Sequence, residues 1–332
     1  MIRSKNIVVL LLCAVIFTIS CEKVVDFRGQ LPQNKIVLNG FVEAGEKIKI
    51  SVSRSWDIME STWTVPPTLE GVEVLLYVNG VLKERMQEVA LPEGSYSGDY
   101  YSYISDVIAD TGDIVELIAK KDGYQDVSSS TVVPPKAVII SVDSVSIVDQ
   151  NYSDAMRVFI KFKDIEPDKR NYYRLVVESL PDENRSYHES VRFNYEKDIA
   201  MNSGYEDSGT GELVGLGKAE NVYHIFDDEI FNGGEYVLNI SFIPQYSHKV
   251  VIDGTVLSEY TSKYCFRLVT LSEESYRYLK SMTDYENGED TNIFVEPDMI
   301  FSNVINGLGI FAAFQKDEII IEMPEKEVTF GI

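Results

Sequence analysis

Most of this sequence consists of short segments in which apolar and polar residues alternate, which restricts the chain to folds built from β-strands. In the segment KIKISVS, Ile48, Ile50 and Val52 alternate with lysine and serine. A period of two places apolar side chains on one face of a strand and polar side chains on the other. Residues 157–163 (RVFIKFK) and 235–242 (EYVLNISF) alternate in the same way. We expect each segment to form a strand with one buried face.

Turn signals separate the predicted strands. Asn79 and Gly80 lie between two apolar runs, and both tolerate the positive φ that a two-residue type I′ hairpin requires. Asp122 and Gly123 predict a second hairpin of the same kind. Strands at such short spacing, without a long helical period, predict a mainly β protein. We expect two antiparallel β-sandwiches, immunoglobulin-like or prealbumin-like.

A pair of prolines divides the chain. Pro134 and Pro135 stop the preceding strand, because proline donates no ladder hydrogen bond and restricts the residue before it. A chain of 332 residues is also long enough for two domains. We therefore place an N-terminal β-sandwich domain at residues 21–135 and a C-terminal β-rich domain at residues 136–332.

One short helix is expected in the second domain, near residues 272–282. Ser272 can cap its N-terminus, and Tyr276, Leu279 and Met282 recur at helical spacing. This stripe would cover one edge or face of the second sheet.

Two polar stretches predict loops. Residues 202–221 are rich in glycine, serine and acidic residues, and indicate a mobile surface loop. Residues 284–292 (DYENGEDTN) offer several oxygens around Gly288, which suits calcium, but their spacing departs from that of an EF-hand. A plain acidic loop is favoured there, and whether calcium binds stays open.

The first twenty residues predict an export signal. Arg3 and Lys5 precede an apolar run that ends at Ser20, and this run is too short to span a bilayer comfortably. Cys21 follows at once, as in bacterial lipoproteins, whose signal is cut before a cysteine that carries diacylglycerol and usually a further chain such as palmitate. Two such chains anchor a protein stably, at about 0.8 kcal/mol per buried methylene. An ordinary secretory signal and an uncleaved anchor helix are the alternatives.

The charge and the remaining cysteines exclude other classes of protein. The chain has a net charge of -23, which becomes -25 if the signal leaves with its two basic residues. Nucleic-acid binding needs a basic surface, so no nucleic-acid partner is expected. Cys13 lies in the signal and Cys265 has no internal partner, so no disulfide framework holds the fold. Cys265 alternates with aromatic neighbours and should be a strand residue.

Several segments of the second half resemble a known family, the Bacteroidota lipoproteins classified as domain of unknown function 4249. The most specific run contains Glu296-Pro297, Ser302-Asn303 and Gly307-Leu308-Gly309, while Asn306 stands where a second glycine is often found. The segments that carry the resemblance are KDIEPDKRNYYRLVV (163–177), FDDEIFNGGEYVLNISF (226–242), LSEESYRYLKSM (271–282) and FVEPDMIFSNVINGLGIFAAF (294–314).

This resemblance implies a location and a partner. It would cover nearly the whole chain after Cys21, and it implies a lipoprotein of the cell envelope, at the outer membrane. Genes of such proteins are often found beside those of TonB-dependent receptors, which implies a role around uptake. The resemblance supplies no catalytic residue.

Residues that could carry catalysis are dispersed. His188, His224 and His248 show no metal-ligand spacing, and the segment GSYSG (94–98) has tyrosine where a nucleophile elbow needs serine. Carboxylates such as Asp227-Asp228-Glu229 are abundant, so a glycosidase is not excluded. We expect no catalytic residue, no metal site and no cofactor.

Trp56 and Trp63 are the candidates for contact with a ligand or partner. Both follow a predicted strand, and exposed aromatic side chains on sandwich loops commonly stack on sugars or hold partners. We expect a lipid-anchored, non-catalytic binding component that contacts the membrane, a TonB-dependent receptor and a glycan or peptide ligand. A glycan hydrolase that uses paired carboxylates and a structural or adhesive surface protein remain the alternatives.

Overall fold

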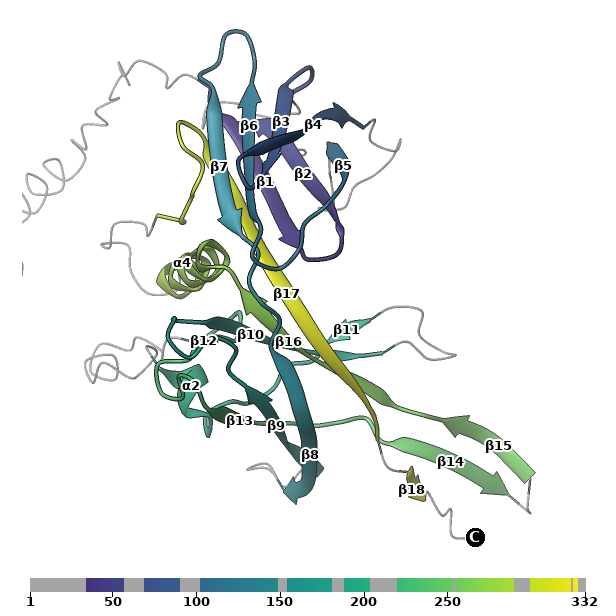
Figure 1. The fold of residues 1–332 in the computed structure, drawn as a ribbon. Coiled ribbons are helices and arrows are strands. Elements are labelled where there is room, and N and C mark those ends of the chain that lie inside the picture. Colours follow the sequence, from purple (N-terminus) through teal and green to yellow (C-terminus); the bar gives the residue numbers. More distant parts are fainter. Residues whose placement is uncertain are drawn as a thin grey trace, which may run out of the picture. The chain divides into compact units, whose positions relative to one another are not determined.

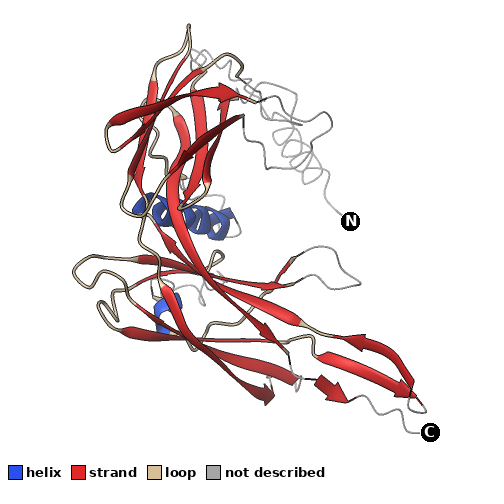
Figure 2. Ribbon diagram, turned by 45° about the vertical axis from the view of Figure 1, so that its right-hand side comes forward, coloured by secondary structure: helices blue, strands red, loops and turns tan. Residues whose placement is uncertain are grey.

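The computed structural model describes residues 34–56, 69–89, 102–148, 154–180, 188–203, 220–252, 255–289, 299–323 and 325–327. These residues belong to one compact unit, Asn34–Ile332. Most of its described residues lie in strands, and the described part contains two helices (Figure 2). The prediction of a mainly β, sandwich-like protein is confirmed.

The elements carry the labels of Figure 1. In chain order they are β1 (Ile36–Glu43), β2 (Lys47–Arg54), β3 (Glu73–Val78), β4 (Val81–Glu88), β5 (Tyr103–Ile108), β6 (Ile114–Lys120), β7 (Val127–Val132), β8 (Val138–Val148), β9 (Asp154–Lys163), β10 (Tyr172–Ser179), β11 (Glu189–Ser190), α2 (Ile199–Asn202), β12 (Ile225–Asp227), β13 (Glu235–Phe242), β14 (Ser247–Ile252), β15 (Thr255–Tyr260), β16 (Lys263–Leu271), α4 (Glu273–Glu289), β17 (Leu308–Glu322) and β18 (Glu325–Glu327).

The strands form three sheets. One sheet has twelve strands, in the order β11-β10-β16-β17-β1-β2-β5-β4-β3-β6-β7, with β12 paired to β10. The two others have three strands each, in the orders β13-β9-β8 and β15-β14-β18. Nearly all pairs are antiparallel, as expected, but β1 pairs with β17 and β14 pairs with β18 in parallel.

The strand β17 links the two halves of the sequence (Figure 1). Its first part, from Leu308 to Phe314, pairs with β1, and its remainder pairs with β16. The predicted division at Pro135 follows the order of the chain, but the hydrogen bonding of the large sheet crosses it. Parallel pairing requires a long connection, here most of the chain, and so leaves no local turn signal in the sequence.

The alternating strands bury two main clusters of apolar residues. The first cluster lies among β1 to β7 and also takes Val304, Phe311 and Ala313 from near the C-terminus. The second lies between the β9 and β13 pair and the β10 and β16 pair, with Phe162, Tyr173 and Phe266 fully buried. The period of two seen in the sequence is therefore the period of burial.

The two predicted hairpin turns differ. Asn79 and Gly80 have φ values of 53° and 73°, which confirms the two-residue turn between β3 and β4. At the second turn only Gly123 has a positive φ, of 84°, and the Tyr124 N–H donates to the Lys121 carbonyl over 3.0 Å. A type I′ turn needs positive φ at both central residues. The two-residue turn predicted there is wrong, and a longer loop joins β6 to β7.

The helix α4 starts where predicted and ends later. Ser272 caps it, since its Oγ accepts from the Ser275 N–H over 3.3 Å. Tyr276 and Leu279 pack inward as expected, whereas Ser275 and Thr283 are the most buried residues of its inner face. The acidic loop predicted at 284–292 is wrong for residues 284–289, which continue the helix because nothing before Gly288 breaks it.

The remaining expectations are met in part. β7 ends at Val132, just before the proline pair, as predicted.

Most of the loop predicted at 202–221 lies outside the described residues, and the short helix α2 that precedes it was not expected. Neither helix of the described ranges combines the length and hydropathy needed to cross a membrane.

Candidate functional site

Of the residues predicted to bind, the structure describes only Trp56. Cys21 and Trp63 are outside the described residues, and so is the rejected segment 94–98. Trp56 lies two residues after the end of β2 and is half-buried. The structure instead gathers tyrosine and arginine side chains around α4, where the helix lies over β10, β12, β16 and β17. We call this surface the helix-covered face.

The start of α4 is held by a network of hydroxyl groups. The Ser272 Oγ that caps the helix also accepts from the Ala313 N–H of β17 over 3.2 Å. The Ser275 hydroxyl donates to the Ala313 carbonyl over 2.9 Å, and the Thr131 hydroxyl of β7 lies 3.2 Å from the Ser272 Oγ. All three serine and threonine residues are buried. The helix start is therefore fixed to strands from both halves of the chain.

A pair of stacked tyrosine rings lies under the first turns of α4. The rings of Tyr172 and Tyr276 have centroids 4.4 Å apart and an interplanar angle of 24°. Burial raises the pKa of Tyr276 to about 12, with Asp227 adding to the shift. Beside the stack, Arg170 pairs with Asp227 over 2.7 Å and with Glu229 over 2.9 Å. Two of the three acidic residues at 227–229 are thus ordinary ion-pair partners.

Arg174 also lies on this face, on the same side of β10 as Tyr172. Arg174 of β10 donates through Nε to the Tyr223 carbonyl over 3.1 Å, and its guanidinium carbon lies 5.7 Å from the Tyr223 ring centroid. Among the described residues it forms no ion pair, although the chain has 53 acidic residues. Burial lowers the pKa of Arg174. An incoming carboxylate or another planar acceptor would be a suitable partner for it.

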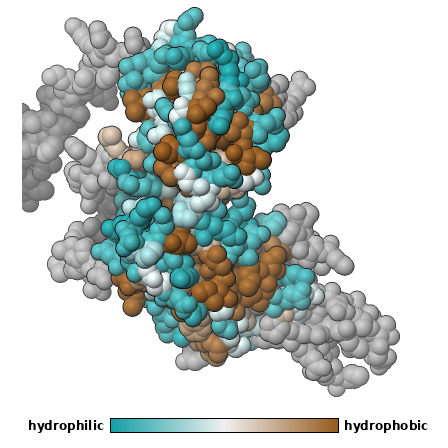
Figure 3. All heavy atoms as spheres, viewed as in Figure 1, coloured by the Kyte–Doolittle hydropathy of each residue, from teal (hydrophilic) through white to brown (hydrophobic). Residues whose placement is uncertain are grey.

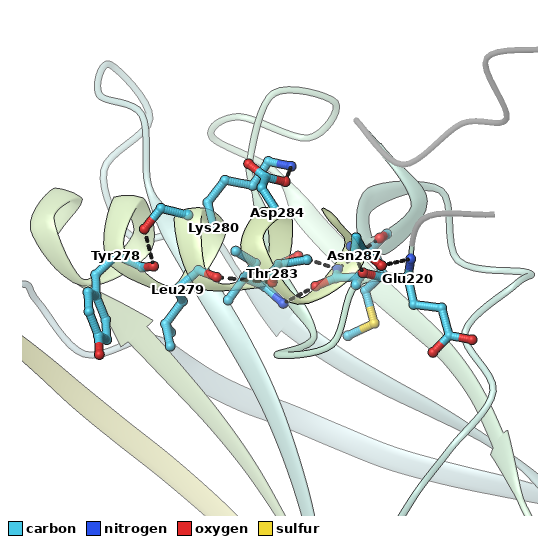
Figure 4. Close-up of polar contacts among 11 residues, drawn as sticks. Glu220, Tyr278, Leu279, Lys280, Thr283, Asp284 and Asn287 are labelled. Atoms are coloured by element: carbon cyan, nitrogen blue, oxygen red, sulfur yellow. Dashed lines mark hydrogen bonds and ion pairs between the residues drawn. The ribbon is translucent and has the colours of Figure 1, made fainter. Parts of the chain in front are cut away.

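The far end of α4 is joined to the segment before β12. The Tyr223 hydroxyl donates to Glu286 over 2.6 Å, and burial together with this bond raises the pKa of Tyr223 to about 12. The Asn287 side chain accepts from the Glu220 N–H over 3.0 Å and donates to the Glu220 carbonyl over 2.9 Å (Figure 4). Lys280 and Asp284 pair on the outer side of the helix. The helix-covered face is thereby held at both ends.

His224 lies next to Tyr223 in the segment before β12, but its ring packs against residues of the second core. It adopts a positive φ of 52°, and its ring lies 4.1 Å from the Phe193 ring and 5.6 Å from the Tyr195 ring. Burial lowers the pKa of His224 to about 4, and the nearby Arg174 contributes to the same shift. His224 is therefore neutral near pH 7 and packs as an aromatic ring.

The buried state of His224 predicts a pH dependence of stability. Its pKa falls from 6.5 to about 4 on folding, so the unfolded chain takes up its proton first as the pH drops. The contribution of neutral His224 to the free energy of unfolding is fully present above pH 6.5. It is lost as the pH falls from 6.5 to 4, and the loss is at most about 3 kcal/mol. His224→Asn, which tolerates a positive φ, should lose less stability than wild type over this range in urea unfolding at fixed pH. The exposed His188→Asn serves as control, and a wild-type pH profile for His224→Asn would contradict the prediction.

The third acidic residue of the 227–229 run belongs to a buried network. Asp228 and Asp164 are only 1% and 3% exposed. The Asn171 amide group donates toward both, with Nδ2 at 3.0 Å from Asp164 Oδ1 and 3.0 Å from Asp228 Oδ2. Asp164 also accepts from the Tyr173 hydroxyl over 2.6 Å and from the Gly233 N–H over 2.6 Å. This arrangement holds the loop before β10 against the loop before β13.

The pKa and the hydrogen bonds of Asp228 indicate the role of the paired carboxylates, Asp164 and Asp228. Burial raises the pKa of Asp228, and repulsion from Asp164 adds to this, although hydrogen bonds from Asn171 oppose it. Asp228 Oδ1 has no hydrogen-bond partner in the described structure. The two carboxylates lie within the core and are bridged by one amide, so their first role is to hold the two loops together.

The remaining reactive residues, Cys265 and His188, lie in separate places and do not form a cluster with each other. Cys265 is buried in β16 as predicted, and burial raises the pKa of its thiol. His188 is exposed and lies 3.5 Å from Glu178. Within the described ranges, no group of three or more histidine, cysteine or acidic side chains is placed to hold a metal ion.

The helix-covered face can stack on a ring and pair with an anion. Tyr172, Arg174, Tyr223 and Tyr276 were all missed as site residues. One signal was present, since Arg174 places a charge inside the otherwise apolar run YYRLVV. The rest depend on contacts between segments about 50 to 100 residues apart in the sequence, which no local pattern reveals.

The comparison with protein families gives one assignment. No curated protein matches the chain. A family model described as "Domain of unknown function (DUF4249)" matches residues 22–320 of the 332. The match takes in all strands from β1 to β16, both helices and most of β17. This protein therefore belongs to the family known as domain of unknown function 4249.

Proposed function

We propose that this protein is a lipid-anchored component of the outer membrane that binds a ligand or partner without catalysing a reaction. It works beside a TonB-dependent receptor in the uptake of nutrients. The observation that carries the proposal is Cys21, which directly follows the apolar run of the export signal. A cysteine in that position is the attachment point for lipid in bacterial lipoproteins.

The extent of the family match supports the anchor. The match begins at Glu22, immediately after Cys21, so the shared sequence starts where a processed lipoprotein would start. The apolar run and Cys13 before this point fall outside the match. This is the pattern expected when a signal is removed and Cys21 becomes the first residue of the mature chain.

The chemistry of the helix-covered face supports binding. Tyrosine rings, and an arginine that forms no ion pair with the described residues, can hold a glycan ring or the carboxylate of a peptide. Arg174 and the Tyr172–Tyr276 stack both lie against α4 or the segment that α4 holds. These residues suit reversible contact, whereas His224 is neutral and packed against rings.

Cys21→Ser is expected to release the protein from the membrane. The serine cannot accept the thioether-linked lipid, so palmitate labelling should vanish and most of the protein should move to the soluble fraction. Loss of two acyl chains removes tens of buried methylenes at about 0.8 kcal/mol each. Cys13→Ser is the matched control, because it changes a cysteine of the same signal and should leave labelling unchanged. An unmodified Cys21 thiol in mass spectra of the native protein would contradict the anchor.

The receptor is tested by crosslinking in intact cells. A photo-crosslinking residue in place of Tyr278, on α4, should recover a β-barrel receptor with the wild-type anchor, and recover much less of it with Cys21→Ser. Membranes that yield the protein in good amount but no receptor would contradict the role in uptake. If Cys21 is labelled with palmitate in the same cells, the proposed lipid anchor would still hold even though the receptor is absent.

A further inference from the structure

The strand β8 lies at the open end of a sheet. It has eleven residues and pairs with β9 alone among the described strands, at the end of the three-stranded order β13-β9-β8. Val138, Ile140, Val145 and Val148 of β8 are 54%, 49%, 48% and 64% exposed. Apolar side chains gather over the part of the surface where β8 lies (Figure 3). A long apolar edge strand is a template for pairing with another strand.

The usual protection of an edge strand is missing along most of β8. Proteins protect edges with lysine, proline, bulges or short strands. β8 contains no lysine, arginine or proline, and its register shift lies near its start, between Ile139 and Ser141. The N–H groups of Ala137 and Ile139 donate to Thr270 and Asp317, so the start of the edge is satisfied. Among the described strands, none besides β9 pairs with the stretch from Ser141 to Val148, which is therefore available to a new strand.

The two faces of this stretch differ in what they would accept. Val142 lies opposite Ile160 and packs on the edge of the second core, so an added strand would present an apolar side chain beside it. Asp143 lies on the other face, opposite Phe159, and is the one charged residue of β8. Asp143 has no ion pair within the described structure. A basic side chain beside it would form a favourable cross-strand pair.

These charges argue against a second copy of the chain as occupant. Asp143 is near the middle of β8, so two copies paired antiparallel about this point would place one Asp143 beside the other. Like charges directly opposite each other destabilise a strand pair. The net charge of -23 adds to the repulsion between copies. The occupant that fits is a different protein with positive charge at this point.

We propose that β8 binds an extended segment of a partner protein by strand addition. That segment carries a lysine or arginine beside Asp143, with apolar residues at the flanking positions that cover Val142. Backbone hydrogen bonds to the edge supply affinity, and the basic residue sets the register. The proposal extends the binding role proposed above to a defined surface, and its test does not involve Cys21, so either can fail alone.

Two nine-residue peptides test the proposal on the full mature chain in detergent. Both alternate valine and threonine, and the central residue is lysine in one and glutamate in the other. The lysine peptide should slow hydrogen exchange at the amides of residues 141–148 and bind about fivefold more tightly than the glutamate peptide. Asp143→Lys should reverse this preference. Absence of protection at β8 with either peptide, or a preference unchanged by Asp143→Lys, would overturn the proposal.

Matched variants locate the binding surface. Val145→Lys should weaken binding of the lysine peptide at least fivefold, because it adds a positive charge and removes an apolar contact at the edge. Val132→Lys makes the same change at an equally exposed valine of β7, 49% against 48%, and should leave binding unchanged. Equal loss in both variants would overturn the assignment to β8. Self-association that Val145→Lys abolishes would overturn it in favour of a second copy.

Discussion

Gly309→Ala is expected to lower the free energy of unfolding by about 3 to 5 kcal/mol, measured by urea denaturation. Gly309 has a φ of 106°, which residues with a side chain rarely adopt. A Cβ at this position would also overlap the carbonyl oxygen of Leu38 and come within 2.7 Å of Asn39 Oδ1. Neither neighbour can move freely, since both belong to β1 and Asn39 Oδ1 accepts from the Ile310 N–H.

The effect should be large because the clash falls on the pairing that joins the two halves of the chain. Leu38 and Gly309 are partners in the parallel register of β1 and β17. Displacement of β17 there would disturb Phe311 and Ala313, which lie in the first core. Gly309 therefore allows the backbones of β1 and β17 to approach each other closely.

Gly112→Ala is the control that separates strain from overlap. Gly112 also has a positive φ, of 84°, but a Cβ there would meet nothing within 4 Å. Gly112→Ala should lower the free energy of unfolding by only about 1 to 2 kcal/mol, which is the penalty for a side chain on a left-handed backbone. Equal losses for both variants would show that φ alone matters and that the contact with β1 does not.

Asn171→Ala is expected to destabilise the protein by about 3 to 5 kcal/mol, because it removes one side-chain donor from each of two buried carboxylates. The Asn171 Nδ2 lies within 3.1 Å of two backbone carbonyls, of Glu166 and Lys169, as well as of Asp164 and Asp228. An alanine removes every one of these bonds. Thermal and urea unfolding at pH 7 would measure the loss.

Asn287→Ala gives the matched comparison for Asn171. The Asn287 amide also bridges backbone groups, through the Glu220 N–H and carbonyl, but at an exposed position where water can replace it. Its loss should cost no more than about 1 kcal/mol. If Asn171→Ala were as mild, the buried carboxylates would have to find other donors, and the network would not hold the two loops.

Local patterns predicted the elements of this fold well. Alternation placed β2, β9 and β13, and Asn79-Gly80 placed one hairpin turn, because both signals depend on residues next to one another. Ser272 marked the start of α4 for the same reason. The end of α4 was missed, since Asp284, Asn287 and Gly288 are weak helix formers. The last turns are held by contacts such as that of Asn287 with Glu220.

The candidate site could be predicted much less well. Trp56 and Trp63 were chosen because they are aromatic and follow a predicted strand, whereas Tyr172 and Tyr276 of the helix-covered face lie within a strand and a helix. These two tyrosines are 104 positions apart and meet only because β10 lies under α4. The lack of an ion pair between Arg174 and the described acidic residues likewise depends on which side chains surround it, and the sequence around Arg174 does not show this.

The sequence by itself determined the mainly β class, the positions of the strands and the cap of α4, and it is the basis for the proposed lipid attachment at Cys21. Only the tertiary structure decided that β17 pairs with β1 in parallel, that Asn171 bridges two buried carboxylates and that β8 is left at an edge. The reason is the range of the interactions. Periodicity, turns and caps act over a few residues, whereas strand order and burial depend on contacts between distant segments, which form only when the whole chain is folded.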